Sequence, residues 1–204
     1  MTPLALSGSS VDGPLYLDVV DLAHRSPGWL DDTIAVWSAY GLAVFALLML
    51  VGWWRARRDG ADAAMTALAV PVAVVAAFGV NSLVKPLVAE DRPCRRLAFR
   101  TLEACPARGD WAFPSNHTAV ACAAAVALFF VSRRLGAVAS VCAVAMAASR
   151  VWVGVHYPHD VVAGAVLGAL AGCLAMIALR RSPAALAGRL AGTRLRPLLV
   201  SGAP

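Results

Sequence analysis

The sequence predicts an all-α bundle of membrane-spanning helices, and three observations support this fold class. Of the 204 residues, 60% are hydrophobic and 15% are charged, which is outside the range of ordinary water-soluble domains. Long apolar runs recur along the chain, and since a spanning helix needs roughly 20 apolar residues, the length suits about five or six membrane helices. The 18 Lys and Arg residues fall in short clusters between these runs. Although the net charge is +6, this clustering indicates membrane loops, so we expect no nucleic-acid partner.

An amphipathic helix is expected ahead of the first span. Residues 11–24 place apolar side chains at near-helical spacing: Leu15, Val19, Leu22 and Ala23. The segment is too short and too acidic to cross a bilayer. We therefore interpret residues 1–32 as an N-terminal interfacial segment, with a packed entry loop as the alternative.

The remaining chain divides into predicted spans and loops within a single membrane-embedded domain, 1–204. The spans are expected at about 33–54, at about 61–84, from near 118 to 133, at about 135–148 and at about 158–179. A polar loop, 85–117, separates the second and third spans, and residues 182–204 form a predicted cytoplasmic tail.

The arginine clusters predict the orientation. Those at 55–58, at 133–134 and after 180 follow alternate span ends, so they lie on one side, which is expected to be the cytoplasm. Loop 85–117 and the stretch 149–160 then lie together on the outer face. An external position permits a disulfide between Cys94 and Cys105. The cysteine spacing does not match a zinc site, so we expect no structural metal.

The stretch from Ser149 to Asp160 joins two apolar segments and carries Arg150 and His156. Arginine grips a phosphoryl group through a planar fork of donors. A neutral imidazole can attack phosphorus, and a carboxylate behind it fixes the tautomer and stabilises the imidazolium. This combination predicts phosphate chemistry on the outer face.

Two further polar clusters lie at span ends on the same predicted side. The first, from Lys85 to Pro93, has the pattern K-x6-R-P and includes Arg92. The second reads P-S-N-H and ends with Ser115, Asn116 and His117. Together with S-R-x5-H-x3-D from Ser149, their order and common side make the combination far more specific than any one pattern.

These three patterns resemble the signature of the type 2 phosphatidic acid phosphatase superfamily. The middle motif of that family usually reads P-S-G-H, and Asn116 stands where the family has glycine. Within the superfamily, the opening from Leu17 to Asp31 and the run V-G-V-H-Y-P-x-D resemble the bacitracin-resistance type of undecaprenyl-diphosphate phosphatase.

The resemblance implies a role for each motif residue. His156 would be the nucleophile that forms a phosphohistidine, with Asp160 orienting it, and His117 would protonate the leaving oxygen and then activate water. The implied phosphate-binding residues are Lys85, Arg92, Ser115, Asn116 and Arg150. The scheme needs no metal or cofactor, because three cations offset the charge.

The implied function is hydrolysis of undecaprenyl diphosphate to undecaprenyl phosphate and phosphate, which recycles the lipid carrier of cell-wall synthesis. The enzyme would be a multi-pass protein of the bacterial plasma membrane with its active site facing outside. The alternative substrates are phosphatidylglycerol phosphate, phosphatidic acid or a prenyl-phosphoryl sugar. A non-catalytic lipid-phosphate carrier is the alternative outside the enzyme class, but it has no use for two histidines and an aspartate. The oligomeric state does not follow from the sequence.

Other polar residues near the motifs receive weaker interpretations. His159 lies outside the motif and is expected at the surface. Glu90 and Asp91 are expected to balance the charge of the cluster. The loop arginines either steer an anionic headgroup or form a solvated face: Arg95, Arg96 and Arg100.

Overall fold

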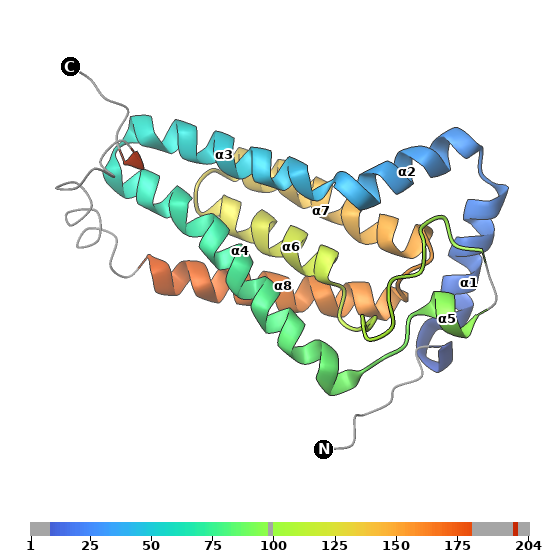
Figure 1. The fold of residues 1–204 in the computed structure, drawn as a ribbon. Helices are drawn as coiled ribbons and strands as arrows, with labels where there is room; N and C mark the ends of the chain where they lie inside the picture. Colours follow the sequence, from blue (N-terminus) through green and yellow to red (C-terminus); the bar gives the residue numbers. More distant parts are fainter. Residues whose placement is uncertain (1–8, 98–99, 181–197, 200–204) are drawn as a thin grey trace.

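The computed structural model describes residues 9–97, 100–180 and 198–199, and these ranges contain helices and loops without a strand. The helices are α1 (Ser9–Arg25), α2 (Gly28–Tyr40), α3 (Leu42–Asp59), α4 (Ala61–Val88), α5 (Pro93–Arg96), α6 (Asn116–Phe129), α7 (Arg133–Trp152) and α8 (Pro158–Leu179) (Figure 1). The predicted all-α class is confirmed. The predicted tail, 182–204, lies outside the described residues apart from 198 and 199.

The part of the chain that the structure describes contains fewer candidate spans than the sequence predicted. The helix that begins at Ala61, α7 and α8 are long and apolar enough to cross a membrane, and the α2–α3 pair makes a fourth candidate, bent by 54°. Helix α6, expected as a full span, has 14 residues. At about 1.5 Å per residue it is about 21 Å long, less than the roughly 30 Å of a bilayer core. Among the described residues, length and composition therefore support three spans, or up to four, where the sequence predicted about five.

Two helix ends differ from the prediction in a way that affects the motifs. Helix α4 continues to Val88, so Lys85 lies in its last turn rather than in the following loop, and Ala89 ends the helix with a left-handed backbone (φ 52°). Helix α7 continues to Trp152 and therefore carries Arg150 in its last turn. Helix α8 has the predicted bounds and begins at Pro158, a residue suited to a first helical turn.

The long helices present large apolar side chains on the outside of the bundle. More than half of each of the following residues is exposed: Val75, Leu83, Val141, Val144, Leu170 and Leu174. Such side chains are as apolar as lipid tails, so this surface fits a hydrocarbon environment. The protein is therefore a helical membrane protein.

Helix α6 lies in the middle of the bundle and packs against α3, α4, α7 and α8 (Figure 1). Helix α8 approaches it without intervening side chains. A Cβ atom added at Gly164 would lie 2.5 Å from the Ser115 carbonyl oxygen, and one at Gly168 would lie 2.1 Å from the Ala119 carbonyl oxygen. These glycines, four residues apart, permit close backbone approach, as small residues do in membrane helix pairs. The start of α6 is thereby held directly against α8.

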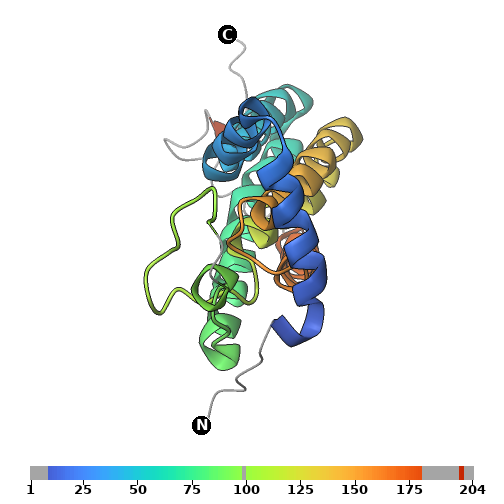
Figure 2. The same cartoon turned by 90° about the vertical axis from the view of Figure 1, so that its right-hand side faces the viewer.

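Helix α1 crosses the end of the bundle where α7 passes into α8, and Figure 2 looks directly at this end. The Tyr16 hydroxyl donates a hydrogen bond to the Gly154 carbonyl (2.9 Å), and the Tyr16 and Tyr157 rings pack 5.3 Å apart. The predicted helix is present, and its placement at a membrane interface stays a prediction. Leu15 and Leu22 are 53% and 55% exposed. The buried residues are Gly13, Tyr16, Val20 and Ala23.

Candidate active site

The three motifs meet around one cavity of about 240 Å³ at the end of the bundle that α1 covers. Lys85 comes from α4, Arg92 from the turn after it, His117 from the start of α6, and Arg150 from the end of α7. Described residues that line the cavity are Leu42, Phe78, Lys85, Arg92, Pro106, Asp110, Asn116, His117, Val120, Arg150 and His156. Cations and imidazoles thus share the cavity with an apolar wall from α3, α4 and α6.

His156 lies between α7 and α8, and it is 1% exposed. Its Nδ1 is 3.3 Å from Asp160 Oδ2, and its Nε2 is 3.1 Å from Nη1 of Arg92. A guanidinium only donates hydrogen bonds, so Nε2 must accept, and the ring proton belongs on Nδ1, facing the carboxylate. The partners therefore assign the tautomer with an unprotonated Nε2, whose lone pair accepts from Arg92, a residue that lines the same cavity.

The charge state of His156 follows from its surroundings. Burial lowers the pKa of His156 well below its ordinary value, and the positive charges of Arg92, Arg150 and Lys85 lower it further. The imidazole is therefore neutral at pH 7, which is the form in which a histidine can act as a nucleophile.

Asp160 is fully buried in the first turn of α8. Its Oδ2 also accepts a hydrogen bond from the Tyr157 backbone N–H (2.8 Å), which fixes the carboxylate at the start of the helix. Its backbone carbonyl accepts a hydrogen bond from the Ser115 N–H (3.0 Å). The second and third motifs are therefore joined through the main chain.

The P-S-N-H motif is only partly in the cavity. Asn116 and His117 line it, whereas Ser115 is fully buried behind them, and its hydroxyl accepts a hydrogen bond from Thr118 Oγ1 (3.2 Å). A phosphate contact by the Ser115 side chain stays a prediction. The sequence interpretation missed Asn81 on α4, which donates to Asn116 Oδ1 (2.6 Å). The signal was present, because Asn81 is a polar residue inside an apolar span.

Each cation in the cavity already has an oxygen partner from the protein. Arg92 Nη2 donates to Asp110 Oδ1 (3.0 Å), and Lys85 Nζ lies 3.7 Å from the same atom. Arg150 Nη1 donates to the two carboxylate oxygens of Glu103 (3.2 and 3.1 Å). Burial raises the pKa of Asp110, but the charges of Arg92 and Lys85 outweigh it, so the pKa lies below its ordinary value. These loop carboxylates occupy donors that a phosphate would need.

Glu103 belongs to a loop closed by a disulfide. The structure pairs Cys94 with Cys105, whose Cα atoms are 5.9 Å apart. Arg96 forms an ion pair with Asp91 (3.6 Å), and the Arg100 carbonyl is 2.9 Å from His24 Nε2. The cavity lining described above does not include the loop arginines Arg95, Arg96 and Arg100, and their role in steering an anion stays a prediction.

The prediction that His159 lies at the surface is wrong. Its side chain is 19% exposed, and its two ring nitrogens face Asp12 on α1 and the buried Glu90. Glu90 does balance charge, but it does so through His159 rather than through the motif cations. Within the described part of the chain, the donors close enough to share a metal ion are those of Glu90, His159 and Asp160. In this arrangement His159 itself is the cation between the carboxylates.

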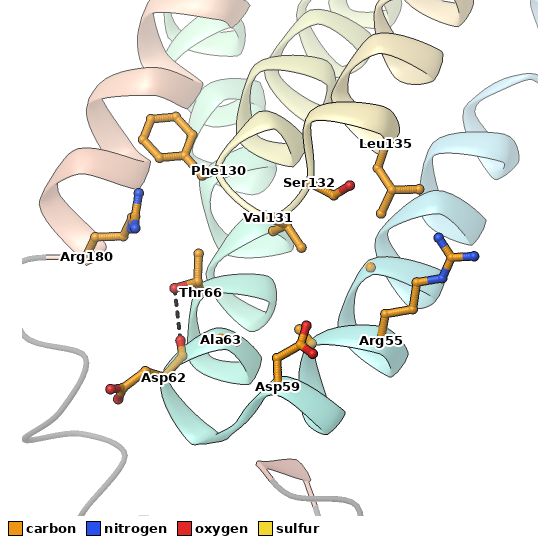
Figure 3. A pocket seen from close by; sticks show the side chains of 12 residues that line it. Arg55, Asp59, Asp62, Ala63, Thr66, Phe130, Val131, Ser132, Leu135 and Arg180 are labelled. Carbon is orange, nitrogen blue, oxygen red and sulfur yellow. Dashed lines mark hydrogen bonds between the residues drawn. The ribbon is translucent and has the colours of Figure 1, made fainter.

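A second cavity, of about 540 Å³, lies at the opposite end of the bundle (Figure 3). Arg55 and Asp59 from the end of α3, Asp62 from the start of α4, and Arg180 after α8 line it. It is larger than the motif cavity, but the described residues around it include no histidine and no motif residue. The chemistry therefore belongs to the smaller cavity.

The chain has relatives among known families and sequences. Residues 66–183 match the PAP2 superfamily. The chain is 29% identical to the undecaprenyl-diphosphatase BcrC of Bacillus subtilis (strain 168) over 160 residues, which are 78% of this chain and 80% of that protein. It is 44% identical to the bacitracin transport permease protein BcrC of Bacillus licheniformis over 61 residues, 30% of each chain.

Two solved structures have a similar fold. The crystal structure of Aquifex aeolicus LpxE has a TM-score of 0.64, covering 82% of this chain and 95% of that chain. The PAP2-type phosphatidylglycerolphosphate phosphatase from Bacillus subtilis has a TM-score of 0.63, covering 82% of this chain and 83% of that chain. The sequence of each is 21% identical to this chain, so the likeness shows a shared fold alone.

Proposed function

Because the chain belongs to the PAP2 superfamily, we propose that this membrane phosphatase hydrolyses a prenyl diphosphate, releasing the prenyl monophosphate and inorganic phosphate. The observation that carries the proposal is the geometry of His156, which lines the cavity with an unprotonated Nε2 toward Arg92 and with Nδ1 facing Asp160. A binding protein would need the cations of the cavity but has no use for an oriented, neutral imidazole. The arrangement supports catalysis by covalent transfer.

The proposed reaction has two steps. First, Nε2 of His156 attacks the terminal phosphorus, and the bond from phosphorus to the bridging oxygen breaks. Burial and the charge of Arg150 lower the pKa of His117 to about 4 in the free site. His117 therefore takes up the proton that it gives to the departing prenyl phosphate only once the bound diphosphate offsets these cations and raises that pKa. Second, His117 takes a proton from water, whose oxygen attacks the phosphohistidine, releasing phosphate and restoring His156. Asp160 offsets the positive charge of the imidazolium in the first step. Lys85, Arg92 and Arg150 offset the charge on the transferring phosphoryl oxygens.

The cavity supports a lipid substrate with a compact headgroup. Its volume of about 240 Å³ is below the roughly 300–1,000 Å³ of ordinary small-molecule pockets. A phosphate headgroup can fit inside, whereas a long apolar chain must lie along the bundle. Leu42, Phe78 and Val120 form the apolar wall of the cavity, and Phe78 is 46% exposed on the outside of α4. We place the tail along this wall.

The choice of a prenyl diphosphate rests on the sequence similarity to the undecaprenyl-diphosphatase of Bacillus subtilis. The product would be a carrier lipid ready for another round of cell-wall synthesis. We further propose a bacterial plasma membrane location with the cavity facing outside. Arg55, Arg58, Arg133 and Arg134 lie at the end of the bundle away from the cavity, which favours that end as the cytoplasmic one.

The test is phosphate release by the purified protein in detergent, with EDTA present, from undecaprenyl diphosphate, phosphatidylglycerol phosphate and phosphatidic acid in parallel. A His156→Ala variant runs beside it, with His24→Ala as the control histidine. We expect metal-independent release that favours the prenyl diphosphate, survives in His24→Ala and is lost in His156→Ala. Release from the glycerolipids alone would reject the substrate and keep the mechanism. Tight binding without release from any lipid would reject the reaction.

A further inference from the structure

His159 connects three carboxylates from different parts of the chain. Its Nδ1 is 2.8 Å from Asp12 Oδ1, and its backbone N–H donates to Asp12 Oδ2 (2.6 Å). Its Nε2 is 3.1 Å from each carboxylate oxygen of Glu90 and 3.5 Å from Asp160 Oδ1. Ionised carboxylates only accept hydrogen bonds, so both ring nitrogens must donate. The partners therefore assign His159 as an imidazolium.

The position of this cation matters because of the oxygen it faces. Asp160 Oδ2 is used by His156 and by the Tyr157 N–H, whereas Oδ1 is buried and has no hydrogen-bond partner among the described residues. A buried carboxylate oxygen without a donor is costly. The Nε2 atom of His159 is the cationic group that approaches Oδ1. His159 therefore balances Asp160 on the side away from His156.

The surroundings of His159 fix its ring in place. The ring stacks with two aromatic side chains, the Tyr157 ring 5.5 Å away at 18° and the Phe113 ring 6.0 Å away at 27°. Asp12 holds Nδ1 from α1, and Glu90, which is 1% exposed, holds Nε2 from the turn after α4. A solvated surface histidine has none of these restraints.

We propose that His159 is a positioning residue of the phosphatase reaction, held by Asp12 and Glu90, which keeps Asp160 ionised and aimed at His156. The inference rests on the proposed roles of His156 and Asp160. It adds a layer behind them that reaches α1, so the N-terminal helix becomes part of the catalytic apparatus. Partners behind a metal-bound histidine orient it and raise its basicity. By the same physics, His159 orients Asp160, which is the partner of His156, and keeps it charged.

The test separates positioning from folding by its kinetic signature. His159→Leu removes the cation and both donors, and His159→Gln keeps one donor near the position of Nε2. We expect kcat of His159→Leu to fall about 10- to 100-fold, the effect typical of losing such a partner. KM and the Ki of inorganic phosphate should stay within about twofold, because Lys85, Arg92 and Arg150 are untouched. His159→Gln should recover part of the lost kcat.

Asp12→Asn provides a second variant in case the substitutions at His159 prevent folding. It keeps the shape of the side chain and weakens the hold on Nδ1, so kcat should fall about 3- to 10-fold with KM unchanged. Asp18→Asn, at an exposed position of the same helix, and His24→Leu are the matched controls and should keep wild-type kinetics.

Three results would overturn the inference. One is wild-type kcat in His159→Gln and Asp12→Asn together. Another is a loss in kcat matched by an equal rise in the Ki of phosphate, which indicates general damage. The third is activity lost with EDTA and restored by a divalent ion, which would assign Glu90, His159 and Asp160 to a metal. Each variant is compared with the wild type on whichever lipid the wild type hydrolyses, so failure of the prenyl diphosphate assignment leaves this test intact.

Discussion

At the scale of single residues, the candidate site depends on which ring nitrogen of His156 carries the proton. Arg92 can only donate to Nε2 of His156, and the carboxylate of Asp160, when ionised, can only accept from Nδ1. The two neighbours therefore select one tautomer before any substrate arrives. The tautomer is therefore set in advance, as fixed polar groups are in catalysis, and Nε2 has to release its hydrogen bond with Arg92 before it attacks phosphorus.

The charge state of His156 gives the first prediction. Because burial and the neighbouring cations lower its pKa well below about 6.5, the folded protein binds this proton less readily than the unfolded chain. The free energy of unfolding should therefore decrease as pH falls through about 6.5, and the ring should stay neutral there. Histidine-labelled protein, with His156→Gln for assignment, provides the NMR titration. A His156 signal that titrates at or above pH 6.5 would contradict this account.

At the scale of elements, the loop between α5 and α6 supplies anions to the cavity. Glu103 forms an ion pair with Arg150, and Asp110 forms ion pairs with Arg92 and Lys85. These are the cations that the phosphoryl oxygens must contact. The sequence interpretation did not include either carboxylate, because nothing in their spacing links them to the motifs. Substrate must displace them or share their donors.

Removal of the Glu103 charge should strengthen phosphate binding. In Glu103→Gln, Arg150 loses its ion pair (3.1 Å) and becomes available to the phosphate. The Ki of inorganic phosphate should fall about two- to fivefold, the size expected for a partly exposed ion pair. Asp91→Asn is the matched control, since the Asp91–Arg96 pair lies outside the cavity lining. An unchanged or higher Ki in Glu103→Gln would show that Glu103 does not compete with phosphate.

The contact between α6 and α8 gives a prediction about stability. A Cβ at Gly168 would meet the Ala119 carbonyl oxygen at 2.1 Å, so Gly168→Ala must push the two helices apart. At Gly79 on α4, nothing lies within 4 Å of such a Cβ. In detergent, Gly168→Ala should lower Tm and reduce activity. Gly79→Ala should leave both unchanged or raise Tm slightly, since alanine is the better helix former by about 1 kcal/mol. Equal Tm values for the two variants would contradict the close contact.

At the scale of the whole molecule, the orientation is open to direct measurement. Arg108, exposed beside the cavity end, and Arg58, exposed at the other end, are suitable labelling positions. In intact cells, a membrane-impermeant maleimide should label Arg108→Cys and spare Arg58→Cys, with the unsubstituted chain as background. The reverse pattern would place the cavity on the cytoplasmic side.

The sequence predicted the helical class and the three motifs because each depends on local features. Apolar runs define α4, α7 and α8, and the start of α8 follows from Pro158. The shortness of α6, the bend between α2 and α3 and the glycine contact depend on packing between helices, which no single segment specifies. The interpretation of His159 failed for the same reason, because its partners Asp12 and Glu90 are 147 and 69 residues away along the chain.

The cavity wall has a consequence for how such an enzyme can change. The reacting groups lie at helix ends and are tied to one another through main-chain bonds and buried charges, whereas Leu42, Phe78 and Val120 are simple apolar side chains. Exchanging these three alters the shape of the wall that meets the lipid chain and leaves the proton positions at His156 intact. Related enzymes can therefore acquire specificity for new lipids through substitutions in the cavity wall, while the catalytic residues stay the same.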